Sequence, residues 1–218
     1  MVSTFLVISV LFFFVSCEQN CQQYGASSQE SQVTCPTPTG ENSGTDTSGD
    51  VIEADAQMFE GRVHFTNFQD DEEEKVVEAI EIIKKIVKTS EFKNRVLNFT
   101  FNGKKQFNDN NGLSNEEIYQ LLISGKEELE PVVDSEMDLE LELYYTWKNT
   151  VGYTTPGEMT IYLNRKFFTN FNSLQVAGNL FHEWVHKLGF DHASTYSVER
   201  DSSVPYALGY IIEELGKK

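Results

Sequence analysis

Apolar residues recur along the chain with two different periods, and each period predicts its own kind of element. Residues 70–90 show the helical period most clearly, with apolar side chains at every third or fourth position. Acidic residues open this segment and lysines close it, which suits the positive and negative ends of a helix dipole. The apolar stripe of the expected helix consists of Val76, Val77, Ile80, Ile83 and Val87.

Alternation of apolar and polar residues predicts strands elsewhere in the chain. In residues 137–143, methionine and leucine alternate strictly with acidic residues, as in a strand with one buried face and one solvated face. We expect a second strand at residues 160–164. A third is expected at residues 95–101, followed by a tight hairpin turn at Asn102 and Gly103.

Local signals predict three further helices. Ser114 and Glu117 form a capping box, and Gly125 is suited to end the helix that begins there. A second helix is expected to begin at about Asn172 or Ser173. The third is expected near the end of the sequence given, where apolar residues again recur at helical spacing.

Three of the four histidines lie close together and share one pattern with a glutamate and a glycine. His182, Glu183, His186, Gly189 and His192 occupy the specified positions of an HExxHxxGxxH run. Four residues apart on a helix, His182 and His186 lie on one face and can reach one tetrahedral metal at about 2.0–2.1 Å. Glu183 lies one step round the helix, where a carboxylate can act as general base on metal-bound water. Gly189 can adopt positive φ, so the chain can turn there and bring His192 back to the metal.

This run resembles the long zinc motif of the metzincin clan of zinc metallopeptidases. The resemblance implies one catalytic zinc ion held by His182, His186 and His192. It also implies Glu183 as general base and acid, and peptide bonds as the substrate. The protein is therefore expected to be a zinc-dependent endopeptidase.

The methionine turn of that family is not matched, because no methionine follows His192. We expect the apolar segment 203–209 to form a tight turn in its place. Within this segment, Tyr206 is a candidate to pack beneath the zinc, to add a ligand, or to donate its hydroxyl to the tetrahedral oxyanion. The alternative is that Tyr206 is an ordinary core residue.

The expected fold class is α+β and metzincin-like: a small mixed sheet with an active-site helix and a backing helix, and a short C-terminal subdomain that ends in a helix. Trp184, Val185 and Leu188 are expected to pack the active-site helix against the sheet. The resemblance implies that strand 160–164, which precedes that helix, is the edge strand along which an extended substrate lies. The neighbouring tyrosines either line that cleft or pack within the sheet; they are Tyr153 and Tyr162.

Two alternatives to the three-histidine peptidase remain open. The protein is either an active peptidase or a catalytically inactive, metal-stabilised binding lipoprotein. A third ligand could also come from Glu213 or Glu214 on the last helix, as in gluzincin-like enzymes. The remaining histidine, His64, is expected to be an ordinary half-buried strand or loop residue.

The amino-terminal residues predict an exported protein. Residues 1–16 contain an apolar stretch that is too short to span a bilayer comfortably, and they are typical of a signal peptide. Cys17 follows at a position that resembles a bacterial lipobox, which implies lipidation of this cysteine. The expected location is then the cell envelope, at the outer membrane or the cell surface, and the alternative is plain secretion.

Between this cysteine and the folded part, the chain is polar. Residues 17–57 are rich in glutamine, serine, threonine and glycine, so we expect a flexible tether ahead of a catalytic domain at 58–218. Cys21 and Cys35 lie in this tether and either form a disulfide or stay free.

The charge of the chain narrows the possible partners. The formal net charge is −17, from 34 acidic and 17 basic residues. Phosphate binding needs clustered lysine and arginine, so nucleic acid and anionic lipid headgroups are not expected partners. The expected partner is a peptide or protein substrate, with membrane contact only through the N-terminal lipid anchor, and the protein is expected to be a monomer.

Overall fold

A four-stranded sheet and seven helices make up residues 59–218, the part of the chain that the structure, a computed structural model, describes. The α+β fold class is confirmed. The expected signal peptide, Cys17, the tether, and Cys21 and Cys35 lie outside the described residues. The strands are β1 (Glu60–Thr66), β2 (Glu136–Tyr144), β3 (Gly152–Thr154) and β4 (Thr160–Asn164). The helices are α2 (Asp70–Val87), α3 (Ser90–Leu97), α4 (Asn115–Ser124), α5 (Arg165–Phe168), α6 (Ser173–Lys187), α7 (Val198–Asp201) and α8 (Val204–Leu215).

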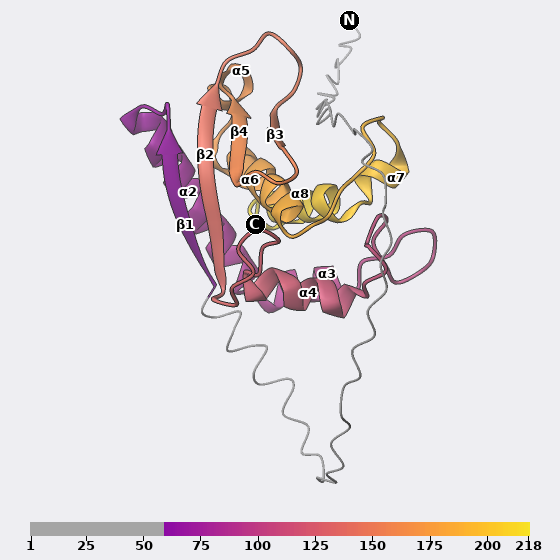
Figure 1. Cartoon of the computed structure of the whole chain (residues 1–218). Coiled ribbons are helices and arrows are strands. Elements are labelled where there is room, and N and C mark those ends of the chain that lie inside the picture. Colours follow the sequence, from indigo (N-terminus) through magenta and orange to yellow (C-terminus); the bar gives the residue numbers. More distant parts are fainter. Residues whose placement is uncertain (1–58) are drawn as a thin grey trace, which may run out of the picture.

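The sheet is mixed, and its strand order is β1-β2-β4-β3 (Figure 1). Strands β1, β2 and β4 are parallel, whereas β3 runs antiparallel to β4. The prediction that strand 160–164 lies at the edge is therefore wrong. A short connection through Gly157, which has φ of 81°, folds β3 and β4 into a hairpin, and β3 takes the outer position. The outer strands of the described sheet are β1 and β3, and β3 is the edge next to β4.

Helix α6 lies at the centre of the molecule, between the sheet and α8 (Figure 1). It also contacts α2, which packs against β1. Trp184, Val185 and Leu188, which are predicted to pack this helix against the sheet, are all buried. None of the helices within residues 59–218 is both long enough and apolar enough to cross a bilayer.

Most of the predicted elements are confirmed near their expected limits. Helix α2 buries its apolar stripe except for Val77, which is exposed. Helix α4 has the Ser114 capping box and ends at Gly125, which has φ of 67°. Helix α6 is capped by Asn172. Strand β2 alternates as expected, but Asp138 is buried and accepts a hydrogen bond of 2.7 Å from the Arg62 guanidinium.

The strand predicted at residues 95–101 is wrong, because most of its first half belongs to helix α3. Thr89 caps this helix by accepting a hydrogen bond from the backbone N–H of Phe92. Phe92 and Val96, one turn apart, are both fully buried, so helical spacing wins over the local strand propensity. The turn at Asn102 and Gly103 is confirmed, with positive φ at both positions.

The tyrosines near the edge of the sheet pack against one another. Tyr153 on β3 and Tyr162 on β4 are cross-strand partners with stacked rings whose centroids lie 4.7 Å apart. Tyr144 contacts both rings edge-on. Between the two alternatives for these residues, the structure supports packing within the sheet.

A buried carboxylate joins the α4–β2 connection to the central helix. Glu127 is 2% exposed, and its Oε1 accepts hydrogen bonds from the Trp184 indole N–H and from the backbone N–H of Asp138. Burial raises the pKa of Glu127 to about 7, and the hydrogen bonds only partly oppose this effect. The folded protein therefore holds a proton on this group more strongly than the unfolded chain does.

Replacing Glu127 by Gln is expected to remove a pH dependence of stability. The pKa of Glu127 is higher in the folded protein than in the unfolded chain. Its protonated form therefore contributes fully to stability below pH 4.5, and this contribution is lost as pH rises through 7. Between pH 5 and pH 8, the free energy of unfolding of the wild type should fall by about 1–3 kcal/mol relative to Glu127→Gln, the lower figure allowing for solvent screening. Urea unfolding at both pH values measures this. The exposed neighbour supplies a control, Glu128→Gln, and equal pH dependence in all three proteins would contradict the prediction.

Candidate metal centre

Helix α6 and the turn after it carry all the residues of the histidine run. His182, Glu183 and His186 lie on α6, which ends at Lys187. Gly189 follows with φ of 90°, the left-handed conformation that the sequence predicted for this position. The chain reverses there and brings His192 back to the helix.

The three histidines meet at one point. The Nε2 atom of His182 lies 3.3 Å from Nε2 of His186 and 3.2 Å from Nε2 of His192. Three ligands on a tetrahedral ion with bonds of about 2.0–2.1 Å lie roughly 3.3–3.4 Å apart. Two of the three nitrogen pairs therefore have the spacing that one metal ion requires. All three nitrogens lie within 4.8 Å of one another and form a group that could hold such an ion.

Backbone carbonyls hold the other side of each imidazole ring. His186 Nδ1 lies 2.6 Å from the carbonyl oxygen of Phe190, and His192 Nδ1 lies 3.0 Å from that of Ala193. His182 is hydrogen-bonded to the backbone of Pro205, which has only a carbonyl oxygen to offer. An Nδ1–H that donates to a carbonyl leaves the Nε2 lone pair free for a metal, so these contacts select the ligating tautomer.

Burial keeps two of these imidazoles neutral. The pKa of His182 is lowered well below its usual range, first by burial and then by the neighbouring histidines. Burial, with a smaller effect of His186, lowers the pKa of His192 to about 4. Neutral imidazole is the form that binds a metal ion, so His182 and His192 do not have to lose protons to bind one at neutral pH.

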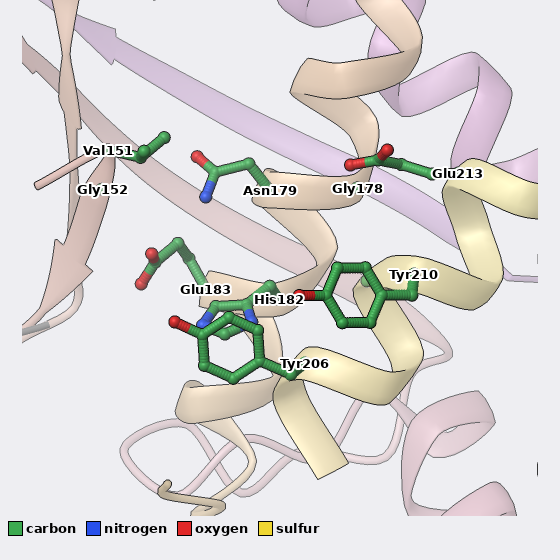
Figure 2. A pocket seen from close by; sticks show the side chains of 10 residues that line it. Val151, Gly152, Gly178, Asn179, His182, Glu183, Tyr206, Tyr210 and Glu213 are labelled. Atoms are coloured by element: carbon green, nitrogen blue, oxygen red, sulfur yellow. The ribbon is translucent and has the colours of Figure 1, made fainter. Parts of the chain in front are cut away.

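Glu183 lies next to the three nitrogens and is almost fully buried. It is 2% exposed, and its Oε2 has no hydrogen-bond partner within residues 59–218. Burial raises the pKa of Glu183 to about 7, against a smaller opposing effect of His186. The backbone of β3 passes close by, because a Cβ at Gly152 would lie 3.1 Å from Glu183 Oε1. Figure 2 shows the carboxylate in the space between α6 and this strand.

Tyr206 packs against two of the three histidines. Its ring centroid lies 4.4 Å from that of His182 and 4.5 Å from that of His192, and the residue is buried. A role for Tyr206 beside a metal ion stays a prediction. The predicted turn at 203–209 is wrong, because Val204 already begins helix α8. Ser203 precedes this helix as its N-cap, and a proline lies in its first turn, which are both signals for a helix start.

A pocket opens beside His182 and Glu183, between the start of β3, one face of α6 and one face of α8 (Figure 2). Sequence reasoning missed Asn179 and Tyr210 as lining residues of this pocket. The helical spacing of Tyr206, Tyr210 and Glu213 was visible in the sequence. The sequence did not show that α6 faces these residues, because the packing of α6 against α8 depends on contacts between distant segments.

The glutamates considered as alternative ligands do not belong to the three-ligand group. Glu213 lines the pocket, whereas Glu214 forms a salt bridge with Arg95. Within residues 59–218, the only group of possible metal ligands that contains His182 and His186 has His192 as its third member. His64 lies in β1, as expected for a strand residue, but it is exposed rather than half-buried.

A buried arginine completes the surroundings of Tyr206. Arg200 is 2% exposed, and its guanidinium lies 4.4 Å from the centroid of the Tyr206 ring. It also donates a hydrogen bond of 3.0 Å to Asp201. Arg200 thus packs on the ring of Tyr206, a contact that the sequence did not predict.

Comparisons with models of protein families, with curated protein sequences and with solved structures found no match.

Proposed function

We propose that this protein is a zinc-dependent endopeptidase of the metzincin type. The observation that supports this most strongly is the set of three Nε2 atoms, spaced for one tetrahedral ion, with a buried carboxylate beside them. Three protein nitrogens leave a fourth position open, which is the arrangement of catalytic rather than structural zinc sites. His182, His186 and His192 would hold the zinc.

The chain's own residues supply the proton transfers. A zinc ion bound here would polarise the peptide carbonyl and make water a better nucleophile at neutral pH. Glu183 Oε2, which has no partner within the described residues, accepts the proton of the attacking water and delivers it to the leaving amine nitrogen.

The edge of the sheet positions the substrate. Strand β3 passes close to Glu183 at Gly152, and among residues 59–218 no strand pairs with its outer side. An extended peptide can pair its backbone with this edge and present its scissile bond to Glu183.

We also propose that the Tyr206 hydroxyl donates a hydrogen bond to the oxyanion that forms on the scissile carbonyl. Figure 2 shows this hydroxyl on the same side of the site as the Glu183 carboxylate. Replacement Tyr206→Phe keeps the ring against His182 and His192 but removes the donor. We expect kcat to fall by about 10²-fold with unchanged zinc content. A change of less than about threefold in kcat would mean that Tyr206 only packs.

Location is a separate proposal, supported by residues 1–16 and Cys17. We propose that the protein is exported and anchored to the cell envelope by lipid on Cys17, with residues 17–57 as the tether. Mass spectrometry of the mature amino terminus would show either a lipidated cysteine or a plain secreted end.

Metal removal tests the function directly. The full chain should bind one zinc and cleave members of a random peptide library, lose cleavage after chelation, and recover it with one equivalent of zinc. Metal analysis and mass spectrometry of the products measure both properties. One zinc without cleavage would favour the metal-stabilised binding lipoprotein, and failure to bind zinc would refute the proposed metal site.

A further inference from the structure

The pocket beside the metal site contains a second carboxylate that the proposed chemistry does not use. Glu213 on α8 is half-buried and lines this pocket together with His182 and Glu183. It forms no hydrogen bond or salt bridge with any residue between 59 and 218. Burial raises the pKa of Glu213, and the positive charge of Lys217 partly opposes this effect. The pocket thus holds a carboxylate that has lost part of its water and gained no partner.

Glycine on the facing helix makes room for this carboxylate. A Cβ at Gly178 would lie 2.5 Å from Cγ and 2.7 Å from Oε1 of Glu213. At Gly209, a Cβ would lie 2.9 Å from the carbonyl oxygen of Gly178, so α6 and α8 approach each other closely here. Figure 2 shows the Glu213 carboxylate lying across Gly178 toward Asn179, at the end of the pocket away from Tyr206.

The pocket is long and has aromatic walls. Tyr206, Tyr210 and Glu213 follow one another on one face of α8, and the last is seven residues after the first, which is about 10 Å along the helix axis. Tyr206 contacts the metal ligands, so Glu213 lies at the far end. A side chain that enters beside the metal must be long to reach Glu213, and its stem would lie against Val151 and the tyrosine rings.

We propose that this pocket receives the side chain of a lysine or arginine next to the scissile bond, and that Glu213 pairs with its positive charge. This inference rests on the proposed peptidase function. Lysine and arginine have long apolar stems with a charge at the tip, which fits aromatic walls that end in a carboxylate. A neutral side chain of the same length would leave the Glu213 carboxylate without a partner, and an acidic one would be repelled. The net charge of −17 also attracts basic peptides to the protein.

Binding and cleavage can be measured separately on the zinc-loaded full chain. Three peptide hydroxamates differ only in the side chain that enters the pocket: lysine, norleucine or glutamate. Calorimetry should show the lysine compound binding at least about tenfold more tightly than the norleucine compound, which corresponds to about 1.4 kcal/mol. Peptides with the same three side chains should be cleaved in the same order.

Variants at two neighbouring glutamates assign the preference to one carboxylate. Glu213→Gln should remove the tenfold preference, and Glu213→Lys should reverse it in favour of the glutamate compound. Glu214→Gln is the matched control, because it removes the same charge from the adjacent residue, which pairs with Arg95 outside the pocket. This control should retain the preference for lysine.

The outcomes separate this inference from the peptidase proposal. Equal affinity for the lysine and norleucine compounds, or a lysine preference that survives Glu213→Gln, overturns the inference even if peptides are cleaved. A lysine preference that depends on Glu213, without any cleavage, supports the pocket's specificity and refutes the peptidase. Failure of all three compounds to bind overturns the inference as well.

Discussion

Replacing Glu183 by Gln is expected to lower kcat/KM for peptide cleavage by at least about 10³-fold while the protein still binds one zinc ion. Glutamine has almost the same shape, but its amide cannot accept the proton that the attacking water must lose. The metal ligands are unchanged, and each keeps its contact with a backbone carbonyl. Metal analysis and single-turnover cleavage of a selected peptide measure the two properties on the same sample.

Glu158 provides a matched control for this substitution. It lies in the β3–β4 hairpin, is exposed, and lines a second hollow, which contains His186 but not Glu183. Glu158→Gln should therefore change kcat/KM by less than about threefold. Equal cleavage by wild type and Glu183→Gln would show that the proton acceptor is another group, or that the activity comes from a contaminant.

The second large effect is expected at the third ligand. His192→Ala removes one of the three nitrogens of the metal group. Loss of a residue that only hydrogen-bonds to a ligand lowers metal affinity by about 10–100-fold. Loss of a ligand itself should lower the zinc affinity by more than that. Cleavage should disappear with the metal. The fold should survive in the absence of zinc, because His192 lies in a loop and only part of its side chain is buried.

Competition with a chromophoric chelator measures the zinc affinity, and circular dichroism checks the fold. His64→Ala is the matched control, because His64 is exposed on β1 and belongs to no metal group within residues 59–218. This variant should bind zinc like the wild type. Wild-type zinc affinity in His192→Ala would contradict the three-histidine site and would call for a ligand outside the run.

The set of three candidate ligands was predictable because its geometry is local. The spacing of His182 and His186 fixes their common face on any helix, and Gly189 supplies a turn that few other residues allow. The limits of α4 and the start of α6 followed from capping residues. Helix α2 begins at Asp70 as predicted but ends at Val87, before the predicted limit at residue 90. Residues 95–101 show where local reasoning failed, because burial of Phe92 and Val96 against the core favoured a helix.

Sequence alone was therefore sufficient for the α+β class, the main helices and the three candidate ligands, all of which depend on neighbours within a few residues. Tertiary structure decided that β3 rather than β4 forms the edge, that Tyr206 packs on two ligands, and that Glu213 closes a pocket over Gly178. Each of these features depends on contacts between segments that lie far apart in the chain. Such contacts form only when the whole core packs, and no local pattern of residues specifies them.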